Sequence, residues 1–218
     1  MNKLHLFFVS FLALLLSTSC TIEQTIDYRT DMSGSNTVII SYGGVVEQMG
    51  DLMGDSAGFD EEMDMSEFMG TLKETFTGIS GVSNTKVINE VEKKIMGFSF
   101  DFKDNRALNL AMAEYLEDEA SPSKKKKAPK NYKTKKKALR LSFDQQDLGS
   151  LSEGLGDPSM AAMLGMFEYS LIVNLPKPIK SVSNPLYAVS EDRKSLSAVV
   201  SFEDLSNGSE DLSVKIKW

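Results

Sequence analysis

The chain has 218 residues with 31 acidic and 24 basic side chains, a formal net charge of −7 at pH 7. It contains a single histidine, His5, and a single cysteine, Cys20. A chain of this length can bury an adequate core without disulfides. Because no histidine and no second thiol follow Cys20, that part of the chain excludes Ser-His-Asp triads, Cys-His nucleophiles and zinc centres built from His or Cys.

Residues 1–19 have the pattern of a secretory signal peptide. Lys3 supplies the positive start, and the apolar run at residues 6–16 is too short for a membrane-spanning helix, which needs about 20 residues. Ser17-Thr18-Ser19 are small and stand directly before Cys20. This ending resembles the bacterial lipobox, with Ser17 where leucine is usual. We therefore expect Cys20 to carry the lipid; the alternatives are an ordinary signal with a chance cysteine, or an uncleaved anchor.

The first part of the mature chain predicts a hairpin followed by helices. Residues 22–28 alternate apolar and polar, residues 31–36 suit a turn, and residues 37–42 are β-branched and aromatic. Apolar residues at helical spacing predict one helix over residues 45–53 and another over residues 65–79, capped by Asp64 or Ser66.

The middle of the chain predicts a second hairpin, from residues 87–91 and 96–102. Asp104 is expected to cap a helix with Leu108, Met112, Tyr115 and Leu116 on one face. A polar loop is predicted over residues 121–137, then a strand over residues 139–143.

The last third predicts a loose helical turn over residues 148–155, a short helix after Asp157-Pro158, and strands over residues 167–175, 196–202 and 212–218. Asn207-Gly208 is a tight-turn signal, so the last two strands are expected to form a hairpin. The sequence predicts a single α+β domain over residues 20–218: an antiparallel sheet of several hairpins with helices packed on one face.

The predicted loop at residues 121–137 is rich in lysine. Its lysines are the candidate contacts for an anionic lipid, glycan or envelope protein: Lys124, Lys125, Lys126, Lys127, Lys130, Lys133, Lys135, Lys136 and Lys137. The competing interpretation is a solvated loop that joins a helix to a strand. We do not expect nucleic acid as a partner, because the rest of the chain is acidic and Tyr132 alone is no stacking platform.

Other clusters carry weaker signals. The acidic cluster at residues 51–67 lacks the ordered spacing of a calcium loop and is expected to be a solvated connection. The methionine-rich stretches at residues 49–69 and 160–166 are typical of a core or an adaptable apolar groove rather than a Cu(I) site. Asp55-Ser56-Ala57 resembles a short periplasmic glycosylation acceptor. No catalytic residue, metal or cofactor is predicted.

Two stretches resemble known lipoproteins. Residues 20–35 read as a strand that leads into a Ser-Gly turn, and the tail Leu175-Pro176-Lys177-Pro178 through Asn184 is followed by two strands. Both are similar to uncharacterised Gram-negative lipoproteins, and the tail resembles the end of LppM-type lipoprotein domains. The resemblance implies an envelope α+β domain without known catalytic residues. Thr21, after the lipidated cysteine, favours the outer membrane with the domain facing the periplasm.

We therefore expect a non-enzymatic, lipid-anchored cell-envelope protein that binds a lipid, glycan or protein partner. The alternative is a structural or assembly lipoprotein that anchors a complex without a ligand of its own. A carboxylate-based hydrolase would need a cleft with two convergent acids.

Overall fold

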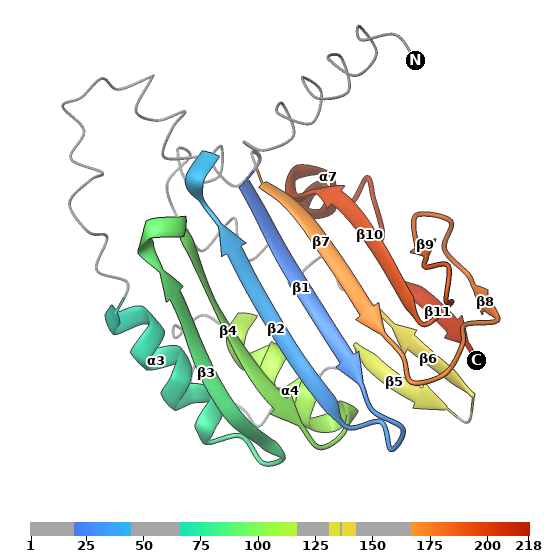
Figure 1. The fold of residues 1–218 in the computed structure, drawn as a ribbon, viewed down its shortest axis with the longest axis horizontal. Coiled ribbons are helices and arrows are strands. Elements are labelled where there is room, and N and C mark those ends of the chain that lie inside the picture. Colours follow the sequence, from blue (N-terminus) through green and yellow to red (C-terminus); the bar gives the residue numbers. More distant parts are fainter. Residues whose placement is uncertain (1–19, 45–65, 117–130, 136, 143–166) are drawn as a thin grey trace, which may run out of the picture.

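The computed structural model describes residues 20–44, 66–116, 131–135, 137–142 and 167–218 (Figure 1). The helices in this part of the chain are α3 (Ser66–Thr77), α4 (Asn105–Leu116), α7 (Phe202–Asn207) and the 3-10 turn η1 (Val91–Lys93). The strands are β1 (Cys20–Tyr28), β2 (Gly34–Ser41), β3 (Val82–Glu90), β4 (Ile95–Phe102), β5 (Tyr132–Lys135), β6 (Ala138–Leu141), β7 (Phe167–Asn174), β8 (Ser181–Val182), β9 (Ala188–Val189), β10 (Ser195–Ser201) and β11 (Val214–Lys217). Among these described helices, none is long and apolar enough to cross a membrane.

The strands form two sheets, which confirms the α+β class. Sheet A has seven strands in the order β3-β4-β2-β1-β7-β10-β9, and sheet B has four in the order β5-β6-β11-β8. Sheet B is antiparallel, whereas sheet A is mixed, because its central strands β1 and β7 run parallel. The prediction of one antiparallel sheet was therefore wrong: β7 follows β1 by more than a hundred residues, and local periodicity does not reveal such a partner.

One face of sheet A packs into the core. Along β7, Phe167, Tyr169, Leu171 and Val173 are buried and the residues between them are more exposed, as expected when side chains alternate between faces. Sheet B contributes Leu139, Leu141, Val214 and Ile216 to the same core. The predicted helices cover only part of this face, and sheet B covers much of the rest.

Helix α3 contributes an aromatic contact to the β3–β4 end of the core. The ring centroid of Phe76 lies 4.8 Å from that of Phe98 and 5.1 Å from that of Phe100, and all three side chains are buried. Tilted aromatic pairs at this separation add to the free energy gained by burial.

Several local predictions are confirmed. β1 and β2 form the first hairpin, although β2 begins at Gly34, inside the predicted turn. β3 and β4 form the second. Asp104 caps α4, because its Oδ1 accepts hydrogen bonds from the backbone N–H groups of Arg106, at 2.9 Å, and Ala107, at 3.0 Å.

The predicted C-terminal hairpin was wrong. Ser201 ends β10 and caps α7, its Oγ accepting from the backbone N–H of Asp204 at 3.0 Å. Gly208 ends this helix with φ 77°, a left-handed conformation that glycine adopts without strain. The Asn-Gly pair therefore terminates a helix, and the chain passes from β10 in sheet A to β11 in sheet B.

The predicted polar loop is also partly wrong. Residues 132–135 form strand β5, in which Tyr132 is buried and Lys133 and Lys135 are exposed. A lysine-rich segment forms a strand here because alternate residues, Tyr132 and Thr134, face inward. The predicted helices at residues 45–53, 148–155 and after Asp157 lie outside the described residues. The same holds for the glycosylation-like tripeptide, for Phe143, and for the acidic and methionine clusters except Glu67 and Met69, which belong to α3.

A buried polar cluster connects the two sheets. Gln24 of β1 donates a hydrogen bond from Nε2 to Asn36 Oδ1 at 2.7 Å and a longer one to the Tyr132 hydroxyl at 3.3 Å, while Tyr169 donates to Gln24 Oε1. Burial raises the pKa of Tyr132 to about 12. Since buried polar groups need partners, these bonds fix how β5 sits against β1.

Candidate lipid anchor and basic face

Cys20 is the first residue of β1, and its position defines one end of sheet A. It is level with Phe167 at the start of β7, and the next residue, Thr21, pairs with Ser41 at the end of β2. Cys20, Phe167 and Phe202 form a small buried cluster at this end. The predicted lipidation residue therefore belongs to the folded sheet and is not separated from it by a linker.

The Cys20 side chain is only 3% exposed. A buried thiol reacts slowly, since a reagent must reach the sulfur and a thiolate is disfavoured in apolar surroundings. A lipid on Cys20 would thus be attached before β1 packs between β2 and β7. In the folded protein, the lipid and the sheet would meet without spacer residues.

The outer face of sheet B is basic. Its outward-facing, exposed positions on β5, β6 and β11 are Lys133, Lys135, Arg140, Lys215 and Lys217, and we call these residues the basic face. Lys133 and Lys215 are both directly opposite Arg140 in the strand register, which makes a row of three cations across the sheet. Side chains directly opposite each other in antiparallel strands have Cβ atoms about 5 Å apart.

No carboxylate compensates this row within the described part of the chain. The ion pairs found there join Arg29 to Asp101 and Lys93 to Glu90, and neither includes a residue of sheet B. Like charges directly opposite each other destabilise a sheet. The outer face of sheet A differs, since it carries the acidic residues Glu23, Asp27, Asp101 and Glu168.

The structure places the predicted lysines unequally. Lys133 and Lys135 belong to the basic face, and Lys137 is exposed in the turn between β5 and β6. Lys124, Lys125, Lys126, Lys127, Lys130 and Lys136 lie outside the described residues. The lysine-rich stretch therefore leads directly into a folded cationic surface.

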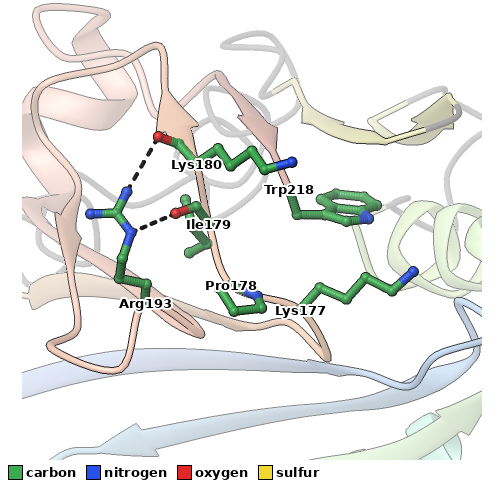
Figure 2. A pocket seen from close by; sticks show the side chains of 6 residues that line it. All are labelled: Lys177, Pro178, Ile179, Lys180, Arg193 and Trp218. Atoms are coloured by element: carbon green, nitrogen blue, oxygen red, sulfur yellow. Dashed lines mark hydrogen bonds between the residues drawn. The ribbon is translucent and has the colours of Figure 1, made fainter.

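A groove adjoins the basic face (Figure 2). It has a volume of about 550 Å³ and is lined by Lys177, Pro178, Ile179, Lys180, Arg193 and Trp218. The two lysines are exposed and extend beside the half-buried indole of Trp218. Lys180 donates its backbone N–H to the Lys217 carbonyl at 2.7 Å, so the backbone of the groove lies beside β11, a strand of the basic face.

Arg193 holds one wall of the groove. Its Nε donates to the Ile179 carbonyl at 2.7 Å and a terminal nitrogen donates to the Lys180 carbonyl at 3.2 Å (Figure 2). The neighbouring carboxylate of Asp192 accepts hydrogen bonds from the Ser190 hydroxyl and from the Lys194 backbone N–H. Both bonds lower the pKa of Asp192, and the bond from the hydroxyl has the larger effect. Two nitrogens of the guanidinium therefore hold the backbone of the groove, and the exposed Lys177 and Lys180 add cations that a ligand can reach.

The groove lies at the opposite end of sheet A from Cys20. β1 and β7 run parallel, with Cys20 level with Phe167 and Asp27 level with Asn174, and Lys177 comes three residues after Asn174. The eight residue steps along β1 span about 26 Å at the usual strand rise of about 3.3 Å.

Sequence reasoning missed the residues that complete this surface: Arg140, Lys177, Lys180, Lys215, Lys217 and Trp218. One signal was present, since Val214-Lys215-Ile216-Lys217 alternates apolar and cationic residues. Nothing local to β6 or β11 indicated that Arg140 and Lys215 are neighbours.

The comparisons with known proteins show a similarity in fold without a sequence family. No protein-family model and no curated protein sequence matches the chain. The fold is similar to that of the folded domain of LppM from Mycobacterium tuberculosis, determined by NMR, with a TM-score of 0.43, 10% sequence identity, and coverage of 91% of this chain and 88% of that chain.

Proposed function

We propose that this protein is a lipid-anchored protein of the bacterial cell envelope that acts by binding an anionic partner through the basic face, without catalysis. One observation carries the proposal: Lys133, Arg140 and Lys215 form a row across sheet B with no carboxylate opposite them in the described structure. Such a row has a cost in the free protein. A polyanion would remove that repulsion and gain charge-assisted hydrogen bonds.

Two features support a lipid anchor at Cys20: the sequence around it and its position as the first residue of β1. The apolar segment and the small residues before Cys20 fit a signal whose cleavage leaves the cysteine first. In a Gram-negative envelope, Thr21 at the next position favours the outer membrane, with the domain in the periplasm.

The anchor is tested by labelling cells with a palmitate analogue. The wild-type chain is expected to be labelled and Cys20→Ala is not. Equal labelling of both proteins would contradict lipidation at Cys20, and membrane fractionation of the same cells tests the outer-membrane assignment.

The binding role is tested with fluorescent dextran sulfate and the full chain in neutral phosphatidylcholine vesicles. The variant K133Q/R140Q/K215Q removes the row, and K73Q/K86Q/K103Q removes the same charge from exposed lysines elsewhere. If each cation of the row contributes about 1 kcal/mol, the first variant binds about 150-fold more weakly. The control variant is expected to bind like the wild type.

Two results would count against the binding role. Equal weakening in both variants would mean that only total charge matters. Absence of dextran sulfate binding by the wild type would favour an assembly lipoprotein that anchors a complex without a ligand.

A further inference from the structure

We infer that the groove beside Trp218 binds an acidic polysaccharide in the compartment, rather than the headgroups of the membrane to which the protein is anchored. This inference rests on the proposed lipid anchor and anionic partner. It is carried by two independent observations: the position of the groove relative to Cys20, and the chemistry of its lining.

The position separates the groove from the anchoring membrane. Cys20 is the first residue of β1, so its lipid holds that end of sheet A close to the bilayer. The groove follows the other end of β7, and the intervening strands measure about 26 Å. The Debye length at physiological ionic strength is about 8 Å, so headgroup charge at the Cys20 end is screened before it reaches the groove.

The lining favours a sugar polymer that carries carboxylates. Lys177 and Lys180 each present an ammonium group with three donors, and Arg193 already uses its Nε and one terminal nitrogen on backbone carbonyls. Among the residues that the structure describes, no acidic side chain lines the groove. The indole ring of Trp218 lies between the two lysines (Figure 2). The face of an aromatic ring is electrically negative, so it attracts the C–H groups on one face of a pyranose ring.

The neighbouring surface favours a polymer over a single sugar. The Lys180 backbone is hydrogen-bonded to that of Lys217, and Lys217 belongs to the basic face. A polymer with one sugar on Trp218 would therefore lie beside the backbone of Lys217, a member of the basic face. Successive acidic sugars of one polymer could then contact several cations of the protein, and because these contacts are linked through the polymer, they would increase its avidity.

The test uses Trp218 as the reporter, since it is the only tryptophan in the sequence. The full chain is reconstituted in phosphatidylcholine vesicles, and its tryptophan fluorescence is titrated with polygalacturonate or with neutral dextran of matched length. We expect a saturable, salt-sensitive change with polygalacturonate alone. K177Q/K180Q should bind about 30-fold more weakly, a fall of about fivefold for each lost cation, while K86Q/K103Q should be unchanged.

A second arm examines the membrane. The protein is placed in vesicles that contain phosphatidylglycerol with bromine near the headgroup, which quenches tryptophan at the surface. We expect Trp218 to remain unquenched, and quenching would overturn the inference in favour of headgroup binding. If K177Q/K180Q binds polygalacturonate as tightly as the wild type, the groove is not the binding site, although the proposed function stands. If no polyanion binds the wild type, the proposed function itself is contradicted.

Discussion

The contact between Asn109 and strand β5 should be a major determinant of stability. Asn109 of α4 accepts a hydrogen bond on Oδ1 from the Tyr132 backbone N–H at 2.9 Å, and its Nδ2 donates to the Tyr132 carbonyl at 2.9 Å. Both residues are 5% exposed. β5 is the edge strand of sheet B, so this side chain takes the place of a missing neighbouring strand at Tyr132.

Asn109→Ala would leave both Tyr132 backbone groups buried without a partner. Each such group costs about 1–3 kcal/mol, and alanine recovers about 0.5 kcal/mol through its higher helix propensity. We expect the free energy of unfolding to fall by about 2–5 kcal/mol, a large share of the roughly 5–15 kcal/mol typical of a domain.

Urea denaturation of the full chain, followed by far-UV circular dichroism, measures this loss. Asn89→Ala is the matched control, because Asn89 is exposed on β3. Asn109→Asp separates the two bonds: a carboxylate can accept from the Tyr132 N–H but cannot donate to the carbonyl. This variant should be destabilised at pH 7 and regain stability on acidification. A loss below about 1 kcal/mol in Asn109→Ala would refute the reasoning.

Four further predictions follow from the same structure. Arg140→Glu places an acid between two lysines and should stabilise the fold by about 0.4–2 kcal/mol while weakening polyanion binding, so a destabilised variant would contradict the charge-row reasoning. Gly97→Ala should disrupt sheet A, because a Cβ there would lie 2.1 Å from the Val38 backbone oxygen. Gly70→Ala in α3 meets open space, so it should stabilise the fold by up to about 1 kcal/mol through the higher helix propensity of alanine, and thermal unfolding compares the two variants. Burial raises the pKa of Tyr132 to about 12, so the stability this residue contributes is complete below pH 10 and falls toward pH 12 by about 1.4 kcal/mol per pH unit. Burial also raises the pKa of Tyr28 and of Tyr187, so Tyr132→Phe should reduce the alkaline loss of stability in urea titrations without abolishing it, and an unchanged slope would exclude Tyr132 as a contributor. Cys20 in the unprocessed, unlipidated chain should react with a maleimide at least about tenfold faster in denaturant than in buffer, and equal rates would mean that the thiol is not buried.

Sequence reasoning succeeded where one segment carries its own signal. The alternation from Phe167 to Asn174 predicts a strand with one buried face, and Asp104 predicts the start of α4, because these patterns depend on neighbouring residues. It failed at Asn207-Gly208, where the same dipeptide serves a hairpin turn or the end of a helix. The capping bond between Ser201 and Asp204 favours the helix.

The sequence alone determined the lipobox-like segment before Cys20, the α+β class and the lysine-rich approach to β5. The tertiary structure decided what these features mean together. It placed Cys20 inside the first strand, paired β1 in parallel with β7, and brought Lys133, Arg140 and Lys215 into one row across sheet B. Burial of alternate residues specifies which side chains face outward, but which strands become neighbours depends on packing between distant segments, and that pairing created the cationic surface.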